Sequence, residues 1–374
     1  MRSLTQSIAF LLFLTCMTAE CFAQPNPGQR EENSPSLQQT LTAIAAKHKI
    51  PGMAVAFIRR GAPTEIAVIG SRDTPAGPPI NRTTVFEAGS LGEPVYAYAA
   101  LTLVAERRLD LGVPLTRYLP LPYVRDMDAL AASGPTEPIY DPRFNQITAL
   151  SILNHTSGMP DWARNDHFRL RLTPGRQWSY SNEGYVYLQH VVDHVTGDPT
   201  EIFLAQTVLG PLGLNHSSFV WREQYGAEFA TGHDRSGAPV APQHYLRIAA
   251  ATTFYTTIED YARFVTALMA SAPAQRTHES VVSLMLNPST TVDGSISFYW
   301  GLGCGIEKPG DDVYFFHRGD VDGFQSFFIG SRKTGTAVVI LTNSENGLDA
   351  VPEIVAETMG GDHPVLKAQF LRGR

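Results

Sequence analysis

The sequence has little cysteine, no long apolar run and no concentration of basic residues. Only 3 of its 374 residues are cysteines. Cys16 and Cys21 fall in an N-terminal segment typical of an export signal, which leaves Cys304 alone and predicts no intramolecular disulfide. The strand-like surroundings of Cys304 predict a buried small hydrophobe rather than a nucleophile. The apolar run at 8–18 is too short to span a bilayer, so we expect no stable membrane anchor.

Basic residues are also too few and too scattered to form a binding surface for anionic polymers. Lys and Arg number 29 against 36 Asp and Glu, a formal net charge of -7. This balance argues against a nucleic-acid partner and against a polybasic membrane patch. With 43% hydrophobic and 17% charged residues, the composition is that of a globular protein with one large core or two smaller ones. Nothing in the sequence indicates an oligomeric state.

The N-terminus has the pattern of a cleavable export signal. Arg2 supplies a minimal positive start, the apolar run at 8–18 follows, and small residues precede a cleavage position near Ala23. Residues 1–23 are therefore predicted to be a signal peptide, and 24–35 a flexible, polar leader. We expect a periplasmic or secreted protein.

Hydrophobic periodicity then divides the chain into strands near both ends and helices between them. Helices are predicted over 36–49, 90–108, 147–155, 184–195, 254–269 and 351–358. Strands are predicted over 53–58, 64–69, 296–300, 313–317, 324–329 and 336–342. The simplest fold class that accounts for this order is α+β, an antiparallel sheet flanked by helices with a mostly helical insertion. The predicted domains are 36–113 together with 250–374 for the sheet, and 114–249 for the helical part.

The pattern Ser90-Leu91-Gly92-Glu93 opens the helix predicted at 90–108 and points to nucleophilic chemistry. A serine needs a base within hydrogen-bonding reach before it can attack a carbonyl. At a helix N-terminus, free backbone N–H groups and the helix dipole favour the negative charge that then develops. Residues i and i+3 share one helix face, so Glu93 is expected to point into the same cleft as Ser90.

Two further patterns lie in order along the chain, Trp178–Tyr185 and Phe316–Asp320. With Ser90–Glu93 they resemble the serine β-lactamase and penicillin-binding-protein superfamily, in its class C-like branch of esterases, D-peptidases and β-lactamases. The motifs of that family are S-x-x-K, Y-x-N, and K-T-G or H-x-G. Further segments similar to the family are Leu109–Pro120, Leu153–Pro160, Pro211–Leu214 and Leu341–Asn343. The resemblance spans roughly 36–360.

The resemblance implies the fold given above and a role for each motif residue. Tyr180 would share a proton relay, and Asn182 would orient the substrate or the relay. His317 would take the family's cationic position on an edge strand, with Arg318 and Gly319 in contact with substrate. The backbone N–H groups of Ser90 and Asp320 would form the oxyanion hole. His155 is assigned to a structural helix end and not to catalysis. The implied partner is a small-molecule or peptide substrate, with no cofactor and no metal.

Glu93 departs from the family, in which a lysine stands at this position. A carboxylate beside Tyr180 would raise the tyrosine's pKa instead of lowering it, so the family's relay cannot be carried over unchanged. Three outcomes stay open: Glu93 acts as the general base, the enzyme is slow and relies on its oxyanion hole, or the chain is a pseudoenzyme that binds a ligand without turnover. Whether the chain is an enzyme is therefore undecided, as is the choice among ester, D-peptide and β-lactam substrates.

Three other patterns are interpreted as coincidental. Lys333-Thr334-Gly335 spells the family's third motif but lies between two predicted strands, where a hairpin turn is expected. Asp320–Gly323 resembles the start of a calcium loop, but no bidentate glutamate follows at the required spacing. Ala88–Gly92 resembles the nucleophile elbow of α/β-hydrolases, yet only about sixty mature residues precede it and no suitable Asp and His partners follow.

Overall fold

The computed structural model describes residues 36–372, with gaps at 74–75, 164–166 and 272–274. Leu37–Arg374 forms one compact unit. The predicted signal peptide and the whole of the predicted leader lie outside the described residues. Of the helices in the described part of the chain, none is both long enough and apolar enough to cross a membrane.

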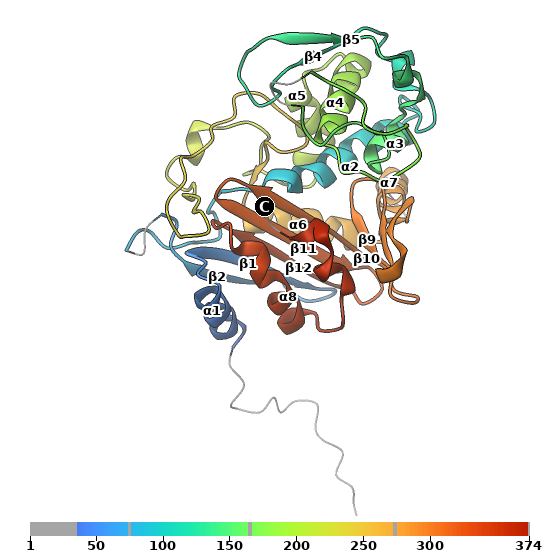
Figure 1. Cartoon of the computed structure of the whole chain (residues 1–374). Helices are drawn as coiled ribbons and strands as arrows, with labels where there is room; N and C mark the ends of the chain where they lie inside the picture. Colours follow the sequence, from blue (N-terminus) through green and yellow to red (C-terminus); the bar gives the residue numbers. More distant parts are fainter. Residues whose placement is uncertain (1–35, 74–75, 164–166, 272–274, 373–374) are drawn as a thin grey trace, which may run out of the picture. The chain divides into compact units, whose positions relative to one another are not determined.

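A single antiparallel sheet, built from both ends of the chain, forms the centre of this unit (Figure 1). Its described strands lie in the order β2-β1-β12-β11-β10-β9-β8-β7. Their bounds are β1 Gly52–Arg59, β2 Glu65–Gly70, β7 Thr290–Asp293, β8 Phe298–Trp300, β9 Gly305–Glu307, β10 Tyr314–Val321, β11 Phe324–Ser331 and β12 Thr336–Thr342. β1 pairs with β12 from Met53 opposite Thr342 to Arg59 opposite Thr336. The predicted fold class is therefore confirmed.

Helices cover both faces of the sheet, so its central strands are apolar on both sides. Along β1, Ala54, Ala56 and Ile58 join the core beneath α2 and α6, whereas Met53 and Val55 join the core beneath α1 and α8. This division follows from the alternation of side chains along a strand. The helices are α1 Leu37–Lys47, α2 Gly92–Ala105, α3 Ala149–Leu153, α4 Asn182–Thr196, α5 Thr200–Leu204, α6 Ile258–Met269, α7 Arg276–Leu286 and α8 Gly347–Thr358.

The section 114–249 supplies α3, α4 and α5, which Figure 1 shows grouped beyond α2 from the sheet. Two small two-stranded sheets accompany them. One joins β4 (Tyr123–Asp126) with β5 (Thr136–Ile139), and the other joins β3 (Phe86–Glu87) with β6 (Tyr255–Thr256). The division into two domains stays a prediction.

The structure departs from the predicted elements at a few places. Ser90 lies in a 3₁₀ turn, η1 (Gly89–Leu91), and α2 begins only at Gly92. The helix α7 was not predicted. The strand β9 was not predicted either, because three residues are too few to show a usable alternation of apolar and polar side chains. Cys304 is fully buried, and Lys333–Gly335 forms the turn between β11 and β12, as expected.

Candidate active site

The turn that carries Ser90 depends on a glycine. Ser90 lies directly before α2, and its side chain is partly exposed. Gly89 has a φ of +55°, and a Cβ there would lie 2.7 Å from Cγ1 of Val321, at the end of β10. Glycine thus provides both the left-handed backbone and the room for close packing. The result is a serine at the N-terminus of a buried helix, pressed against the end of a strand.

β10 approaches this turn most closely at Gly319. A Cβ at Gly319 would lie 2.0 Å from the carbonyl oxygen of Ala88, and the Ser326 hydroxyl donates to that same oxygen at 3.1 Å. β9 pairs only with Tyr314–Phe316 of β10. The following part of β10 therefore has no strand on its outer side among the described residues, and it runs beside the Ser90 turn.

Glu93 lies at the second position of α2 and is enclosed by two histidines. Its side chain and those of His155 and His317 are fully buried. The Oε2 atom of Glu93 lies 3.4 Å from Nε2 of His155 and 3.4 Å from Nε2 of His317. The carboxyl group thus lies between two imidazoles.

The hydrogen bonds at the far side of each imidazole determine what it presents to Glu93. Nδ1 of His155 accepts the backbone N–H of Ser181 at 3.2 Å, so a neutral His155 carries its proton on Nε2 and can donate to Glu93. Nδ1 of His317 lies 2.8 Å from the carbonyl oxygen of Arg318, which only accepts, so this nitrogen carries the proton. Nε2 of a neutral His317 is therefore an acceptor. A favourable contact with Glu93 then requires a proton between the two groups.

Burial decides where that proton lies. Burial raises the pKa of Glu93 well above its ordinary value, although nearby Tyr180 and Arg318 oppose this. Burial lowers the pKa of His317 to about 3 and holds that of His155 well below its usual range. The uncharged arrangement is thus favoured, with the proton on Glu93 and both imidazoles neutral. Burial thus favours a neutral His317, whereas the resemblance implies a cationic group at this position, and the role of His317 stays a prediction.

Tyr180 connects Ser90 to Glu93. The Ser90 side chain lies close enough to Tyr180 to lower the pKa of its hydroxyl, and Tyr180 in turn lies close enough to Glu93 to lower the pKa of that carboxyl. No described residue, however, gives either Glu93 oxygen a hydrogen bond of good geometry. Burial raises the pKa of Tyr180 well above its ordinary value, and the charge of Glu93 raises it further. The direction is the one expected from the sequence, but burial is the larger cause.

Asn182 begins α4 and is held by Asp161. Its Nδ2 donates to the Asp161 carboxylate, and its backbone N–H donates to the Asp161 carbonyl oxygen at 3.1 Å. Ser181 caps the helix by accepting the backbone N–H of Gly184 at 3.0 Å, and its hydroxyl donates to the carbonyl oxygen of Pro160 at 2.8 Å. These contacts therefore fix the chain directly after Tyr180.

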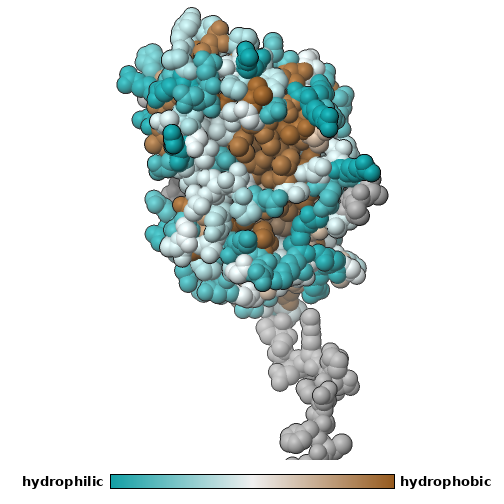
Figure 2. Space-filling view, turned by 90° about the vertical axis from the view of Figure 1, so that its right-hand side faces the viewer, coloured by the Kyte–Doolittle hydropathy of each residue, from teal (hydrophilic) through white to brown (hydrophobic). Residues whose placement is uncertain are grey.

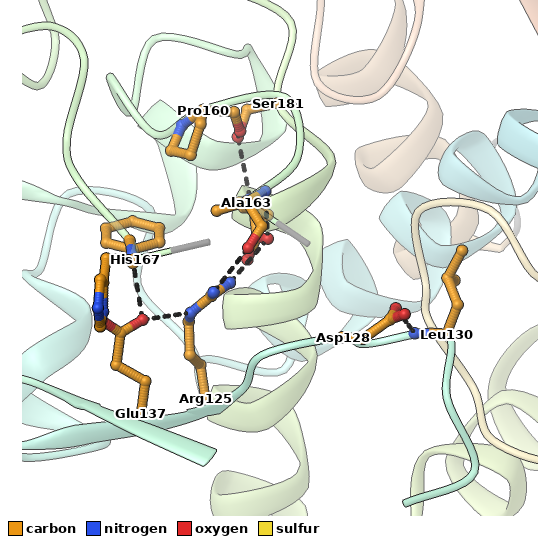
Figure 3. A network of polar contacts seen from close by, with 11 residues as sticks. Arg125, Asp128, Leu130, Glu137, Pro160, Ala163, His167 and Ser181 are labelled. Atoms are coloured by element: carbon orange, nitrogen blue, oxygen red, sulfur yellow. Dashed lines mark hydrogen bonds and ion pairs between the residues drawn. The ribbon is translucent and has the colours of Figure 1, made fainter. Parts of the chain in front are cut away.

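A buried arginine, Arg125, also holds the start of α4 in place (Figure 3). Arg125 donates from Nη1 to Glu183 at 2.9 Å, from Nε to Glu137 at 3.0 Å and from Nη2 to the carbonyl oxygen of Ala163 at 2.7 Å. Figure 3 shows its guanidinium between Glu137 on one side and Ala163 on the other. Since Glu183 lies in the first turn of α4, this network positions Tyr180 and Asn182. The sequence did not predict it, because no local pattern links 125 to 183.

Arg318 and Asp320 pair with each other across one face of β10. Arg318 Nη1 lies 2.8 Å from Asp320 Oδ2, and Gln325 donates to Asp320 Oδ1 at 3.1 Å. Gly319, between them, is the point of closest approach to the Ser90 turn. The oxyanion-hole role of the Ser90 and Asp320 backbones stays a prediction, as does contact of Arg318 and Gly319 with substrate.

His155 is the residue that sequence reasoning left out and the structure brings into the site. It follows α3 with a φ of +56°, and its ring lies in tilted contact with that of Tyr180, with a centroid distance of 4.4 Å. The available signal was a histidine in the polar run Asn154–Ser157 directly after an apolar helix. Among the described residues, no group of three or more His, Cys, Asp or Glu side chains is arranged to hold a metal ion.

The whole scaffold matches one family. The family described as Beta-lactamase matches residues 37–356, which include Ser90, Tyr180 and His317. The chain belongs to the β-lactamase family. It is therefore related to serine hydrolases of the β-lactamase and D-peptidase type.

Individual relatives in this family are distant. A β-lactamase of Pseudomonas fluorescens is 26% identical over 271 residues, covering 69% of this chain and 71% of the relative. Protein flp of Staphylococcus aureus (strain MRSA252) is 23% identical over 336 residues, covering 83% of this chain. The match spans only 62% of the length of Protein flp, less than two thirds.

Solved structures share the fold. A class C β-lactamase superposes with a TM-score of 0.71 at 19% identity, covering 87% of this chain and 96% of the other. A protein titled β-lactamase/D-alanine carboxypeptidase, from Pseudomonas syringae, gives a TM-score of 0.73 at 17% identity, covering 86% and 97%. At these identities the likeness establishes the architecture alone.

Proposed function

We propose that this chain is an exported serine hydrolase in which Ser90 forms an acyl-enzyme with an ester, amide or D-peptide-type substrate. Glu93, held by His155 and His317, takes the part of the general base. The observation that carries this proposal is the pair of 3.4 Å contacts from Glu93 Oε2 to the two Nε2 atoms. They place a buried carboxyl group with a raised pKa one helical turn from the nucleophile.

The proposed proton path runs through Tyr180. When Ser90 Oγ attacks the substrate carbonyl carbon, its proton passes to the Tyr180 hydroxyl, which gives its own proton to the ionised Glu93. The leaving group recovers that proton by the reverse path, and water then hydrolyses the acyl-enzyme by the same steps. Tyr180 acts as a relay and is never ionised at rest, in keeping with its raised pKa.

The environment of Glu93 improves it as a base. A free glutamate, with a pKa of about 4.3, is a poor match for a serine hydroxyl. Burial raises the pKa of Glu93, so its ionised form has a greater tendency to take a proton. The N–H on Nε2 of His155 can then donate to the carboxylate and limit the cost of ionising it. The base is thus available above the raised pKa of Glu93 and blocked below it.

A second function, ligand binding without turnover, is favoured by the same burial. With Glu93 protonated and both histidines neutral, the site holds no strong base at any pH below the raised pKa of Glu93. The cleft, its aromatic walls and the Ser90 turn would nevertheless still recognise an acyl compound or cell-wall peptide. The two functions differ in whether Ser90 reacts.

Covalent labelling separates them. Wild type, Ser90→Ala and Glu93→Lys are incubated with a fluorophosphonate and with a fluorescent penicillin at pH 7 and pH 9, and adducts are measured by intact mass. We expect one adduct on wild type, formed faster at pH 9, and none on Ser90→Ala. No adduct on wild type at either pH, with one appearing on Glu93→Lys, would establish the binding function instead.

Export is part of the proposal and rests on the N-terminal pattern around Arg2 and residues 8–18. Expression of the full chain in a Gram-negative host, followed by fractionation and N-terminal sequencing, tests it. We expect a mature periplasmic protein that begins close to Gln24. An unprocessed cytoplasmic chain would contradict it.

A further inference from the structure

The C-terminal segment brings an additional aromatic side chain into the site. Phe370 lies beyond the residues that match the family, which end at 356. Its ring centroid is 5.3 Å from that of Tyr180 and 5.2 Å from that of Trp300, both in edge-on or tilted contact. The guanidinium carbon of Arg318 lies 5.0 Å from the centre of the same ring. Phe370 thus contacts the proposed relay tyrosine and an arginine of β10 at once.

This segment is anchored on both sides of Phe370. Upstream, His363 Nδ1 lies 2.6 Å from Glu307 Oε2, and the backbone N–H of Val365 donates to Glu307 Oε1 at 3.0 Å. Glu307, in β9, is fully buried, as is Val365, and Leu371 is buried immediately downstream. Phe370 is therefore held as a fixed wall of the site, because the chain around it is pinned to the sheet.

A pocket of about 480 Å³ remains open beside that wall. Trp178, Tyr180, Phe298 and Phe370 supply its aromatic lining, and Val292 adds to the apolar surface. Phe298 belongs to β8, at the end of the sheet beyond β9. Figure 2 views the molecule from the side that lies to the right in Figure 1 and shows that apolar side chains on this face gather within a hydrophilic surround. Because Tyr180 lines this pocket and also interacts with Ser90, a group bound in the pocket would lie beside the proposed relay tyrosine.

We propose that this pocket is a substrate subsite for an uncharged aromatic or branched aliphatic group, with Phe370 as its specificity-determining wall. The inference rests on the proposed function for the reaction itself, although not for binding. Aromatic faces favour flat or branched apolar groups. Arg318 offers no free charge, since it is paired with Asp320 at 2.8 Å and lies against the Phe370 ring. Asp293, at the rim, disfavours anions.

A comparison of two fluorophosphonates tests the subsite. One carries a phenylalkyl group and the other a short ethoxy chain, and the rate constants for labelling Ser90 are measured on wild type, Phe370→Ala and Phe370→Trp. The control is Lys367→Ala, an exposed change in the same segment. We expect Phe370→Ala to be labelled about 10- to 100-fold more slowly with the aryl probe only. A factor of this size corresponds to the free energy usually gained by burying one aromatic ring. Phe370→Trp, which narrows the pocket, should also slow the aryl probe only.

Equal changes with both probes would overturn the subsite. Equal acceleration in Phe370→Ala would show that the C-terminal segment is an inhibitory cap. Equal loss with a lowered melting temperature would show a structural role alone.

A binding measurement keeps the test independent of catalysis. The neutral fluorophore N-phenyl-1-naphthylamine is titrated into Ser90→Ala with and without Phe370→Ala. We expect saturable binding that Phe370→Ala weakens about tenfold or more and Lys367→Ala leaves unchanged. If the fluorophore does not bind to Ser90→Ala, the proposed subsite is wrong. Retained binding without labelling of wild type by either fluorophosphonate would instead overturn the proposed function while supporting the subsite.

Discussion

The carboxyl group of Glu93 and Nε2 of His317 lie 3.4 Å apart, both fully buried, with a hydrogen bond at the far side of His317 that leaves Nε2 as an acceptor. The pair therefore holds one proton between two groups that burial keeps neutral. Glu93, which stands where the resemblance implies a lysine, forms a titratable pair with His317 close to Ser90. In the proposed mechanism, the charge state of Glu93 decides whether Ser90 can be activated.

Glu93→Gln should abolish the rise of Ser90 reactivity with pH. An amide mimics protonated Glu93, since it can donate to His317 and accept from His155, but it cannot take a proton. We expect fluorophosphonate labelling of wild type to increase as pH rises through the raised pKa of Glu93. The variant should label about 10²- to 10⁴-fold more slowly, with a flat profile. A Glu93→Gln profile that parallels wild type would exclude Glu93 as the base.

Glu87→Gln should remove part of the pH dependence of stability. Burial raises the pKa of Glu87 to about 8, Tyr245 opposes this, and Asp322 adds to it. The folded state therefore prefers the protonated acid. Its contribution to stability is complete below pH 4.5 and is lost progressively as pH rises to about 8. Wild type should lose melting temperature between pH 5 and pH 9, and the variant should lose less. Equal slopes for the two proteins would contradict this.

Arg125→Met should destabilise the fold and misplace Tyr180. The change leaves Glu183, which is buried, without its partner, a loss of about 3–5 kcal/mol in the free energy of unfolding. The matched control is Arg143→Met, which breaks the exposed pair with Asp141 and should cost less than about 1 kcal/mol. Urea unfolding measures both. Similar losses for the two variants would show that the Arg125 network does not support the structure.

Gly319→Ala should separate β10 from the Ser90 turn. The new Cβ would lie 2.0 Å from the Ala88 carbonyl oxygen, so the strand or the turn must shift. Overpacking of this kind costs about 1–3 kcal/mol, and we expect Ser90 labelling to slow more than about tenfold. Gly134→Ala, where an added Cβ meets nothing within 4 Å, is the control. Labelling and melting temperature unchanged in Gly319→Ala would refute the close approach.

The strands and helices that could be predicted are those whose own sequence carries a clear hydrophobic pattern. The apolar runs of β1 and β12 are continuous because both faces of those strands are buried, and the runs are long enough to detect. The three residues of β9 carry no such signal, and their strand exists because Glu307 and its neighbours pair with β8 and β10. α2 was predicted from its apolar composition, although its buried surface runs nearly all round and shows no single stripe.

By itself the sequence determined the family, the fold class and the motif residues Ser90, Tyr180 and His317, because short patterns in a fixed order survive even at low identity. It could not place His155 against Glu93, Arg125 against Glu183 or Phe370 against Tyr180. Those contacts join segments 58 or more residues apart, with Arg125 and Glu183 the nearest along the chain. Only the tertiary structure decided the protonation of the site, because that depends on burial and on hydrogen-bond partners that no local spacing encodes.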